Sequence, residues 1–249
     1  MELAGKIALV TGASRGLGKG IALTLAEKGA DIIVNYRSNS AEAEAVKDEI
    51  IAMGRKAIVA QADVSDKESV AGLFATIKQE FGRLDILINN AGTTKAQDIF
   101  ETELEDWEFI LKTNITSAFL CSKAAMEMMK DQQSGRIINI SSIVGHRGAL
   151  FGHVHYAATK SGMFGFTKTL ARTAAPLGIT VNCIAPGIIE TELLFQTHGA
   201  EEVANLASGV PLGLGKVRDI GLAAAYLSGD GGRYITGATI DVNGGMYLR

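Results

Sequence analysis

The chain has 249 residues, of which 47% are hydrophobic and 20% charged, and its formal net charge is -3. This length fits one large α/β domain, and the negative charge argues against nucleic acid as a partner, since nucleic acid needs a basic surface. No apolar run of about 18 residues could span a bilayer and no signal-peptide core precedes the first predicted strand, so we expect a cytoplasmic protein with no membrane partner.

Short apolar runs alternate with amphipathic stretches along the whole chain. The apolar runs, which predict buried strands, cover residues 6–10, 32–34, 57–60, 84–88, 136–140, 179–184 and 239–242. The amphipathic stretches, which predict helices, run from the end of a glycine-rich turn to about residue 28 and cover 41–53, 67–81, 103–130, 155–175 and 217–227. This alternation predicts one doubly wound α/β domain of the Rossmann type over residues 1–249, a seven-stranded parallel sheet in a three-layer αβα arrangement. Only the charge-poor segment 192–209 interrupts it.

A glycine-rich turn joins the first predicted strand to the first predicted helix. Gly12, Gly16 and Gly18 follow the spacing G-x-x-x-G-x-G. A dinucleotide pyrophosphate binds backbone amides at a helix N-terminus where no Cβ is in the way. An ordinary tight turn is the alternative, but the position in the first βα unit favours dinucleotide binding.

The end of the second predicted strand indicates which nicotinamide cofactor binds. Residues 34–37 contain no carboxylate to hold the ribose hydroxyls of NAD, and Arg37 stands at the end of this run. Arg15, inside the glycine turn, would approach the same 2′-phosphate from the other side. The alternative is that both arginines are solvated surface charges. We expect NADP(H).

Tyr156 and Lys160 are spaced i and i+4, so a helix places them one turn apart on one face. A tyrosine phenol ordinarily has a pKa of about 10, and a nearby cation would lower that pKa toward neutral pH. A surface helix with Tyr156 as half-buried packing is the alternative for this pair taken alone.

Several motifs in order carry a resemblance to a known family. They are the glycine turn, Asn89-Asn90-Ala91-Gly92, Asn114, Ser142 and Tyr156-x-x-x-Lys160. With them the chain resembles the short-chain dehydrogenase/reductase family from Lys6 to the C-terminus. Residues 11–16, 186–191 and 242–247 are similar to those of its 3-oxoacyl-acyl-carrier-protein reductases, which act in fatty acid biosynthesis. The resemblance implies strand order 3-2-1-4-5-6-7, a homotetramer built partly on the helix that carries Tyr156, and an NADPH-dependent oxidoreductase that reduces a ketone to a secondary alcohol.

The resemblance also implies catalytic roles. Tyr156 would donate the proton, and Lys160 would lower its pKa and hold the nicotinamide ribose. Ser142 would hydrogen-bond the substrate carbonyl oxygen, with the neighbouring Ser141 as the rival. Asn114 would kink its helix and bind a water that links Lys160 to solvent, or it would merely satisfy backbone groups.

A larger set is expected to contact the cofactor, partly by carry-over from the family. It comprises Gly12, Ser14, Arg15, Gly16, Leu17, Gly18, Arg37, Asp63, Val64, Asn90, Ala91, Gly92, Tyr156, Lys160, Pro186, Gly187, Ile189 and Thr191. Asp63 and Val64 would border the adenine, Asn90 the ribose, and Ile189 and Thr191 the nicotinamide end. Loop and strand-end geometry is the alternative for each; Asp63, for example, would then only cap a helix. Residues from about 190 to 212 would form a substrate lid.

The chain departs from the acyl-carrier reductases in two places. The gap from Ser142 to Tyr156 is one residue longer than usual. The resemblance therefore does not determine the shape of the substrate cleft that residues 146–155 would line. Gln133 and Leu177 stand where those reductases present basic residues to the acidic carrier protein, and a dock without its cations loses steering and affinity. A free or CoA-linked carbonyl substrate therefore becomes credible.

Two further functions remain open. A sugar or polyol dehydrogenase is the nearest rival: Leu193, Leu194 and Phe195 favour an apolar substrate, whereas the histidine-rich loop before Tyr156 favours a polar one. An NADP(H)-sensing protein without turnover is the alternative outside enzymes. The complete set of Asn114, Ser142, Tyr156 and Lys160 speaks against it, because a sensor needs only the glycine turn.

The histidines and cysteines do not predict a metal site. The residues concerned are His146, His153, His155, His198, Cys121 and Cys183, and none has a partner at metal-ligand spacing. We expect the cysteines to be reduced core thiols, and the histidines to give loop polarity or, for His146, His153 or His155, a substrate contact.

Overall fold

The computed structural model describes residues 2–150, 152–197 and 199–248, apart from the side chains of Leu193, Gln196, Thr197 and Ala200. Its core is a seven-stranded parallel sheet in the order β3-β2-β1-β4-β5-β6-β9. The strands are β1 (Ile7–Val10), β2 (Asp31–Tyr36), β3 (Ala57–Gln61), β4 (Ile86–Asn89), β5 (Gly135–Ile140), β6 (Ile179–Pro186) and β9 (Thr239–Val242). The predicted doubly wound sheet and its strand order are confirmed.

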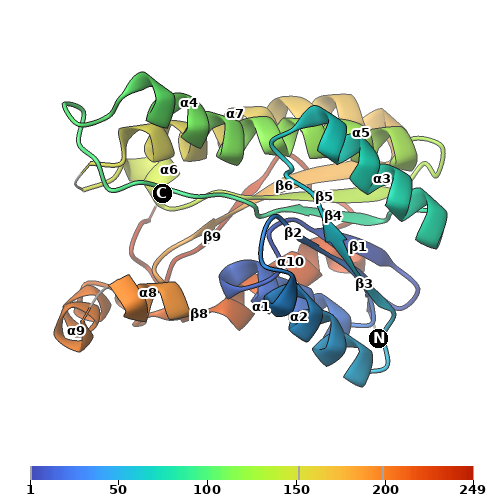
Figure 1. The fold of residues 1–249 in the computed structure, drawn as a ribbon, viewed down its shortest axis with the longest axis horizontal. Coiled ribbons are helices and arrows are strands. Elements are labelled where there is room, and N and C mark those ends of the chain that lie inside the picture. The colour runs from blue at the N-terminus through green and yellow to red at the C-terminus, as the bar shows by residue number, and fades with distance from the viewer. Residues whose placement is uncertain (1, 151, 198, 249) are drawn as a thin grey trace.

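Helices cover both faces of the sheet (Figure 1). One face carries α1 (Gly16–Glu27), α2 (Ser40–Ala52) and α10 (Val217–Ser228). The other carries α3 (Lys67–Phe81), α4 (Leu104–Leu111), α5 (Ser117–Met129) and α7 (Val154–Ala174). Successive strand residues point to opposite faces of the sheet and pack in different hydrophobic cores. Ala8 and Val10 pack with α1 and α10, whereas Leu9 packs with α3 and α5. The continuous apolar runs of the strands therefore follow from burial on both faces.

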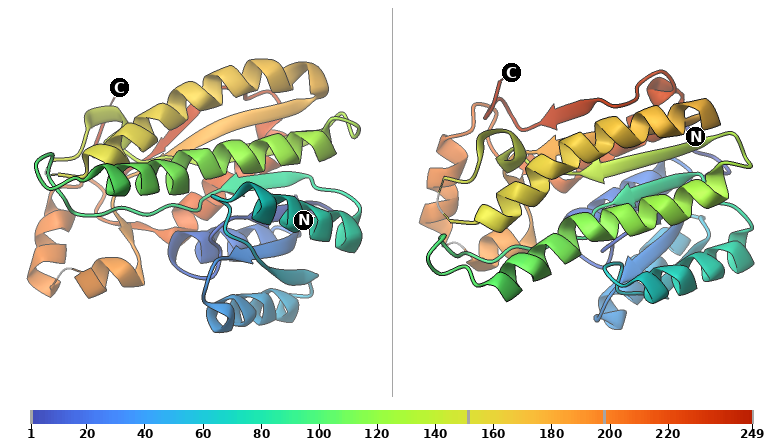
Figure 2. Two further views of the ribbon diagram at one scale, coloured as in Figure 1. Left: turned by 45° about the horizontal axis from the view of Figure 1, so that its top comes forward. Right: turned by 90° about the horizontal axis from the view of Figure 1, so that it is seen from above.

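The predicted helix over residues 103–130 is one helical region with a change of winding in its middle. A π-helical segment, Lys112–Thr116, separates α4 from α5 and contains Asn114. Figure 2 shows this region crossing the same face of the sheet as α7. π-turns widen the helix and are common at functional sites. The kink predicted at Asn114 takes this form.

The structure differs from the sequence prediction in one strand boundary and in two regions with additional helices. The run at 84–88 begins as a strand only at Ile86, and the carboxylate of Asp85 just before it accepts hydrogen bonds from the Ile7 amide and from the Arg83 guanidinium. The segment 192–209 contains α8 (Glu192–Thr197) and α9 (Ala200–Ser208), which project from the body in Figure 1. A short α6 (Val144–Arg147) precedes α7.

The remaining elements are short. β7 (Ile189–Glu190) and β8 (Gly215–Lys216) pair in a separate two-stranded sheet at the base of α8 and α9. The 3-10 turns cover Ala175–Leu177 and Asp230–Gly232. Segments this short carry too few residues for a helical or strand period to be read from the sequence.

Candidate active site

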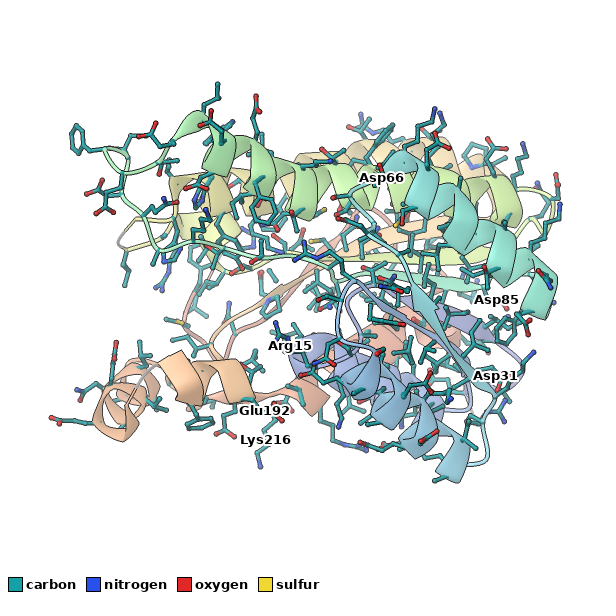
Figure 3. The ribbon with its side chains drawn as sticks, in the orientation of Figure 1. Arg15, Asp31, Asp66, Asp85, Glu192 and Lys216 are labelled. Carbon is teal, nitrogen blue, oxygen red and sulfur yellow. The ribbon has the colours of Figure 1, made fainter. Side chains whose placement is uncertain are left out.

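The carboxyl ends of β1, β4 and β5 meet at one edge of the sheet, because the strands are parallel neighbours. The glycine turn follows β1, Asn90 follows β4 and Ser142 lies just after β5. Figure 3 shows Arg15 at this edge, on the side where Glu192 and the helices α8 and α9 lie, whereas Asp31 and Asp85 lie at the opposite edge. Open α/β sheets bind their ligands at this carboxyl edge.

The glycine turn leaves room for a pyrophosphate beside the start of α1. Gly12 and Gly16 adopt positive φ angles of 63° and 54°. A Cβ on Gly18 would lie 2.2 Å from the carbonyl oxygen of Gly12, so only glycine fits there. Arg15 is the N-cap residue of α1, in extended backbone and without a side-chain cap among the described residues. The first amides of α1 therefore stay available to an anion, and the turn fits the diphosphate of a dinucleotide.

Two polar residues that the sequence interpretation missed hold this turn in place. The side chain of Asn35 in β2 accepts from the Gly12 amide at 3.2 Å and donates to the carbonyl oxygens of Ala60 and Ala62. The hydroxyl oxygen of Thr11 accepts from the Asn90 and Ala91 amides, both at 3.0 Å. A buried asparagine inside an otherwise apolar strand was the available signal for Asn35.

Asn90 is bound to the same turn. Its side-chain amide donates to the carbonyl oxygens of Thr11 at 2.9 Å and Gly12 at 3.2 Å. Gly92, two residues on, approaches Asn114 closely enough that a Cβ would lie 3.3 Å from Oδ1 of Asn114. The 90–92 segment therefore joins the glycine turn to the π-helical segment. Contact of Asn90, Ala91 and Gly92 with a cofactor stays a prediction.

The predicted phosphate-binding arginines are free to meet a ligand. Arg15 and Arg37 are exposed, and neither forms an ion pair within the part of the chain that the structure describes. Asp63 lies near Arg37. Burial raises the pKa of the Asp63 carboxyl, but two hydrogen bonds from Ser65 and the charges of Arg37 and Lys112 outweigh burial, and the net pKa is lowered.

Asp63 does not cap α3, because Asp66 is the N-cap residue and accepts from the Ser69 amide at 2.8 Å. The capping alternative for Asp63 is therefore wrong. Val64, beside it, is buried. Contact of both residues with an adenine stays a prediction.

The other predicted cofactor residues lie at the end of β6 and in the segment that follows it. A Cβ on Gly187 would lie 2.8 Å from the Cα of Asn243, so the chain needs glycine there. Pro186 accepts at its carbonyl oxygen from the Ile143 amide, which ties this segment to the Ser142 turn. Thr191 accepts at Oγ1 from the Leu194 amide at 3.3 Å and so supports the start of α8. Ile189, half-buried, lies in β7.

The structure brings Ser142, Tyr156 and Lys160 together. The hydroxyl of Ser142 lies close enough to Tyr156 to lower the pKa of its phenol. The ammonium nitrogen of Lys160 lies 5.5 Å from the ring centre of Tyr156 and donates to the carbonyl oxygen of Ile140 at 2.8 Å. One turn of α7 and the end of β5 thus supply a phenol, a hydroxyl and an amine at one place.

The predicted lowering of the Tyr156 pKa by Lys160 is not what this structure shows. Burial raises the pKa of Tyr156, and the hydrogen bond with Ser142 lowers it by less. Burial also lowers the pKa of Lys160 to about 8, because its ammonium group is surrounded by protein. Sequence spacing reports the proximity of two groups but not the loss of water around them.

The pKa of Lys160 predicts how stability depends on pH. Between pH 8 and 10.5 the unfolded chain binds a proton at Lys160 that the folded chain lacks, so the contribution of Lys160 to stability rises with pH. From pH 7 to pH 10.5 the unfolding free energy of the wild type, minus that of Lys160→Met, should rise by roughly 3 kcal/mol. Urea unfolding of the cofactor-free proteins measures this difference. For Lys168→Met, an exposed lysine on the same helix, the difference should stay flat, and a flat result for Lys160→Met would contradict the assignment.

The structure separates the two rival serines. The hydroxyl of Ser141 donates to the carbonyl oxygen of Lys160 at 2.7 Å and is buried. Ser142 is partly exposed, accepts from the Val144 amide at 3.1 Å and meets Tyr156. Ser141 therefore holds α7 against β5, and Ser142 faces the reaction centre.

The side chain of Asn114 is engaged with backbone groups. Oδ1 accepts from the Thr93 amide at 2.8 Å, and Nδ2 donates to the Thr93 carbonyl oxygen at 2.9 Å and to Thr159 at 3.1 Å. Thr159 in turn donates to the carbonyl oxygen of Tyr156. Asn114 thus links the loop after β4 to the turn that carries Tyr156. Its role in binding a relay water stays a prediction.

The histidines near the site differ in the hydrogen bonds that their ring nitrogens form. His146 is paired with Asp241 at 2.9 Å, and His198 lies outside the described residues. His155 is buried, which lowers its pKa, and its Nδ1 accepts from the Tyr156 amide. His153, with a φ of 58°, contacts Thr94 through Nδ1 at 2.8 Å. No hydrogen bond within the described ranges engages Nε2 of His153 or Nδ1 of His146.

The two positions at which the acyl-carrier reductases present basic residues lie at the opposite edge of the sheet. Gln133 precedes β5 and Leu177 precedes β6, and a Cβ on Gly178 would lie 2.1 Å from the carbonyl oxygen of Gln133, so the two loops touch. The 21-residue helix α7 separates this place from Tyr156 by about 30 Å. A carrier bound there would lie far from the Tyr156 of the same chain.

Metal-binding clusters and membrane-spanning helices are absent from the described residues, and both cysteines are buried. Nowhere in the described ranges do three or more His, Cys, Asp or Glu side chains gather so as to hold a metal ion. Among the described residues no helix has the length and hydropathy needed to cross a bilayer. Cys121 and Cys183 are free and buried, and burial raises the pKa of each thiol to about 12.

Comparison with known proteins gives consistent matches along the whole chain. The short chain dehydrogenase family profile matches residues 6–201. The 3-oxoacyl-acyl-carrier-protein reductase of Synechocystis sp. is 43% identical over 248 residues, 99% of this chain and 98% of the relative. The reductases of that name from Escherichia coli and Vibrio cholerae are 44% and 45% identical over 249 residues, the full length of both chains in each comparison.

Proposed function

The chain belongs to the short-chain dehydrogenase family, and we propose that it is an NADP(H)-dependent reductase that converts a ketone to a secondary alcohol, with a 3-oxoacyl thioester as its leading substrate. The observation that carries the proposal is that Ser142, Tyr156 and the buried Lys160 lie together at the edge where the glycine turn lies, with the Lys160 ammonium nitrogen 5.5 Å from the Tyr156 ring centre. The names of the similar reductases support the choice of a thioester linked to a carrier protein.

The residues divide the chemistry between them. A bound nicotinamide supplies the hydride. The former carbonyl oxygen then gains negative charge, which the hydroxyl of Ser142 stabilises by a hydrogen bond. Tyr156 donates the proton to that oxygen. Lys160, held by the Ile140 carbonyl oxygen, would together with Asn114 return the proton to Tyr156 from solvent.

The cofactor proposal depends on the free arginines at the glycine turn. Arg37→Asp should weaken NADPH binding by about tenfold to hundredfold, because a charge-assisted contact with the 2′-phosphate becomes a repulsion. NADH, which lacks that phosphate, should bind within about threefold of the wild-type affinity. Fluorescence titration of both nucleotides measures this, with Arg233→Asp as an equally charged change at an exposed arginine outside the site. Equal losses for NADPH and NADH would refute the phosphate assignment.

The substrate class is tested by a panel. NADPH oxidation should be measured with acetoacetyl-CoA, an acetoacetyl carrier-protein thioester, sugars and simple diketones side by side. We expect the thioesters to give the highest kcat/KM. Because Gln133 and Leu177 supply no cations, the carrier-protein form should have little advantage over the CoA form. Turnover of none of these would favour the NADP(H)-sensing alternative.

A sugar or polyol dehydrogenase is the second candidate, and one observation favours it. The start of α7 is polar: His153 contacts Thr94, and Gln97 accepts at its backbone carbonyl oxygen from the His153 amide at 2.8 Å. A preference for sugars in the panel would support this candidate.

We also propose that residues from about 190 to 212 form a substrate lid and that the chain assembles as a homotetramer. We propose a cytoplasmic location and a role in fatty acid biosynthesis. The lid proposal is supported by α8 and α9 projecting from the body beside the site edge. The tetramer proposal is supported by apolar side chains left exposed on two faces, Phe109 and Phe119 on α4 and α5 and Leu222 and Tyr226 on α10. Light scattering tests the assembly.

A further inference from the structure

His146 in α6 is held on three sides by residues distant in the chain. Its ring stacks on Phe164 of α7, with ring centres 4.3 Å apart, and on Tyr247 of the C-terminal tail, with ring centres 5.1 Å apart. Its Nε2 lies 2.9 Å from Oδ1 of Asp241 in β9. Stacking and a hydrogen bond together fix both the position and the rotation of the imidazole.

The turn that contains His146 begins at Ser142. The Gly145 amide donates to the Ser142 carbonyl oxygen at 2.9 Å, and the Val144 amide donates to the Ser142 hydroxyl at 3.1 Å. Gly145 packs so closely on α7 that a Cβ there would lie 2.7 Å from the carbonyl oxygen of Lys160, and its own carbonyl accepts from the Ser161 hydroxyl. A shift of His146 would therefore move the turn that carries Ser142.

The C-terminal tail that presses on His146 is itself fixed. The side chain of Asn243 donates to the Tyr247 carbonyl oxygen at 3.0 Å and accepts from the Gly245 amide at 3.0 Å. The Gly244 carbonyl oxygen accepts from the Leu212 amide at 3.0 Å. Tyr247 is thus a well-supported contact for the imidazole.

We propose that His146 is a positioning residue for the reaction: held by Phe164, Tyr247 and Asp241, it fixes the turn that orients Ser142 toward the substrate carbonyl. The proposal rests on the proposed reductase function for the reaction it serves. If His146 were only a packing residue, its replacement would lower stability without acting through Ser142. Coupling between His146 and Ser142 distinguishes the two roles.

Two substitutions separate the contacts of His146. His146→Phe keeps the stacked ring and removes the bond to Asp241, whereas His146→Gln keeps a donor near the position of Nε2 and removes the ring. Each is made in the wild type and in Ser142→Ala, and kcat and KM are measured with acetoacetyl-CoA at saturating NADPH. We expect each to lower kcat by about threefold to tenfold in the wild type, with NADPH affinity unchanged, because small misplacements of a catalytic group slow the reaction. In Ser142→Ala neither should have a further effect.

A variant of the C-terminal tail tests the same contact without changing His146, so the proposal can be tested even if the His146 variants do not fold. Tyr247→Leu should lower kcat in the same direction, and again only when Ser142 is present. Tyr234→Leu, the same change at an exposed tyrosine, is the control and should leave kcat unchanged. Equal fold losses in the wild-type and Ser142→Ala backgrounds, or an unchanged kcat in every folded variant, would overturn the proposal. A wild type without any turnover would instead overturn the proposed function, and the role of His146 with it.

Discussion

Replacing Tyr156 with phenylalanine is expected to lower kcat for ketone reduction by about three orders of magnitude, while NADPH binds within about threefold of its wild-type affinity. The reason is that the change removes the proton donor and leaves the ring in place. Steady-state rates with acetoacetyl-CoA and fluorescence titration of NADPH measure the two quantities.

The separation of turnover from binding distinguishes the reductase from the sensor. A sensor that only binds the nucleotide would be unaffected by the loss of one phenol oxygen. A matched control is Tyr234→Phe, since Tyr234 is 93% exposed and precedes β9, at the edge of the sheet opposite the site. Retention of more than about a tenth of the wild-type kcat in Tyr156→Phe would contradict the assignment of Tyr156 as proton donor.

The sheet could be predicted from the sequence because its information is local. Buried parallel strands need continuous apolar runs such as Ile7–Val10, and the glycine turn directly after this run marks the nucleotide edge. The helices of residues 192–208 were not predicted, because lengths of six and nine residues give too few turns for a helical period to be read from the sequence. The short α6 escaped prediction for the same reason.

The candidate site could be predicted where spacing along one element decides it, as for Tyr156 and Lys160 on α7. Contacts between distant elements could not be predicted. The pairing of His146 with Asp241 joins residues 95 positions apart, and the bond from Gly12 to Asn35 joins a turn to a neighbouring strand. The direction of the Tyr156 pKa shift was wrong because it depends on burial, which emerges only from packing in three dimensions.

Ser142→Ala is expected to lower kcat by about two to three orders of magnitude, because it removes a hydrogen-bond donor aimed at the oxygen that gains charge. NADPH affinity should change little, since the hydroxyl of Ser142 contacts Val144 and Tyr156 rather than the glycine turn. Loss of this hydroxyl also removes the one interaction that lowers the Tyr156 pKa. The pH above which alcohol oxidation reaches its half-maximal rate should therefore move upward.

Ser141→Ala is the matched control, one residue away and identical in chemistry. Its hydroxyl donates to the Lys160 carbonyl oxygen in the buried contact between β5 and α7. This substitution should cost about 1 kcal/mol of unfolding free energy, and kcat should stay within about threefold of the wild type. Urea unfolding and steady-state kinetics on both variants decide the matter. If Ser141→Ala slows turnover more than Ser142→Ala does, the two serines have been assigned the wrong way round, and the carbonyl-binding hydroxyl is that of Ser141.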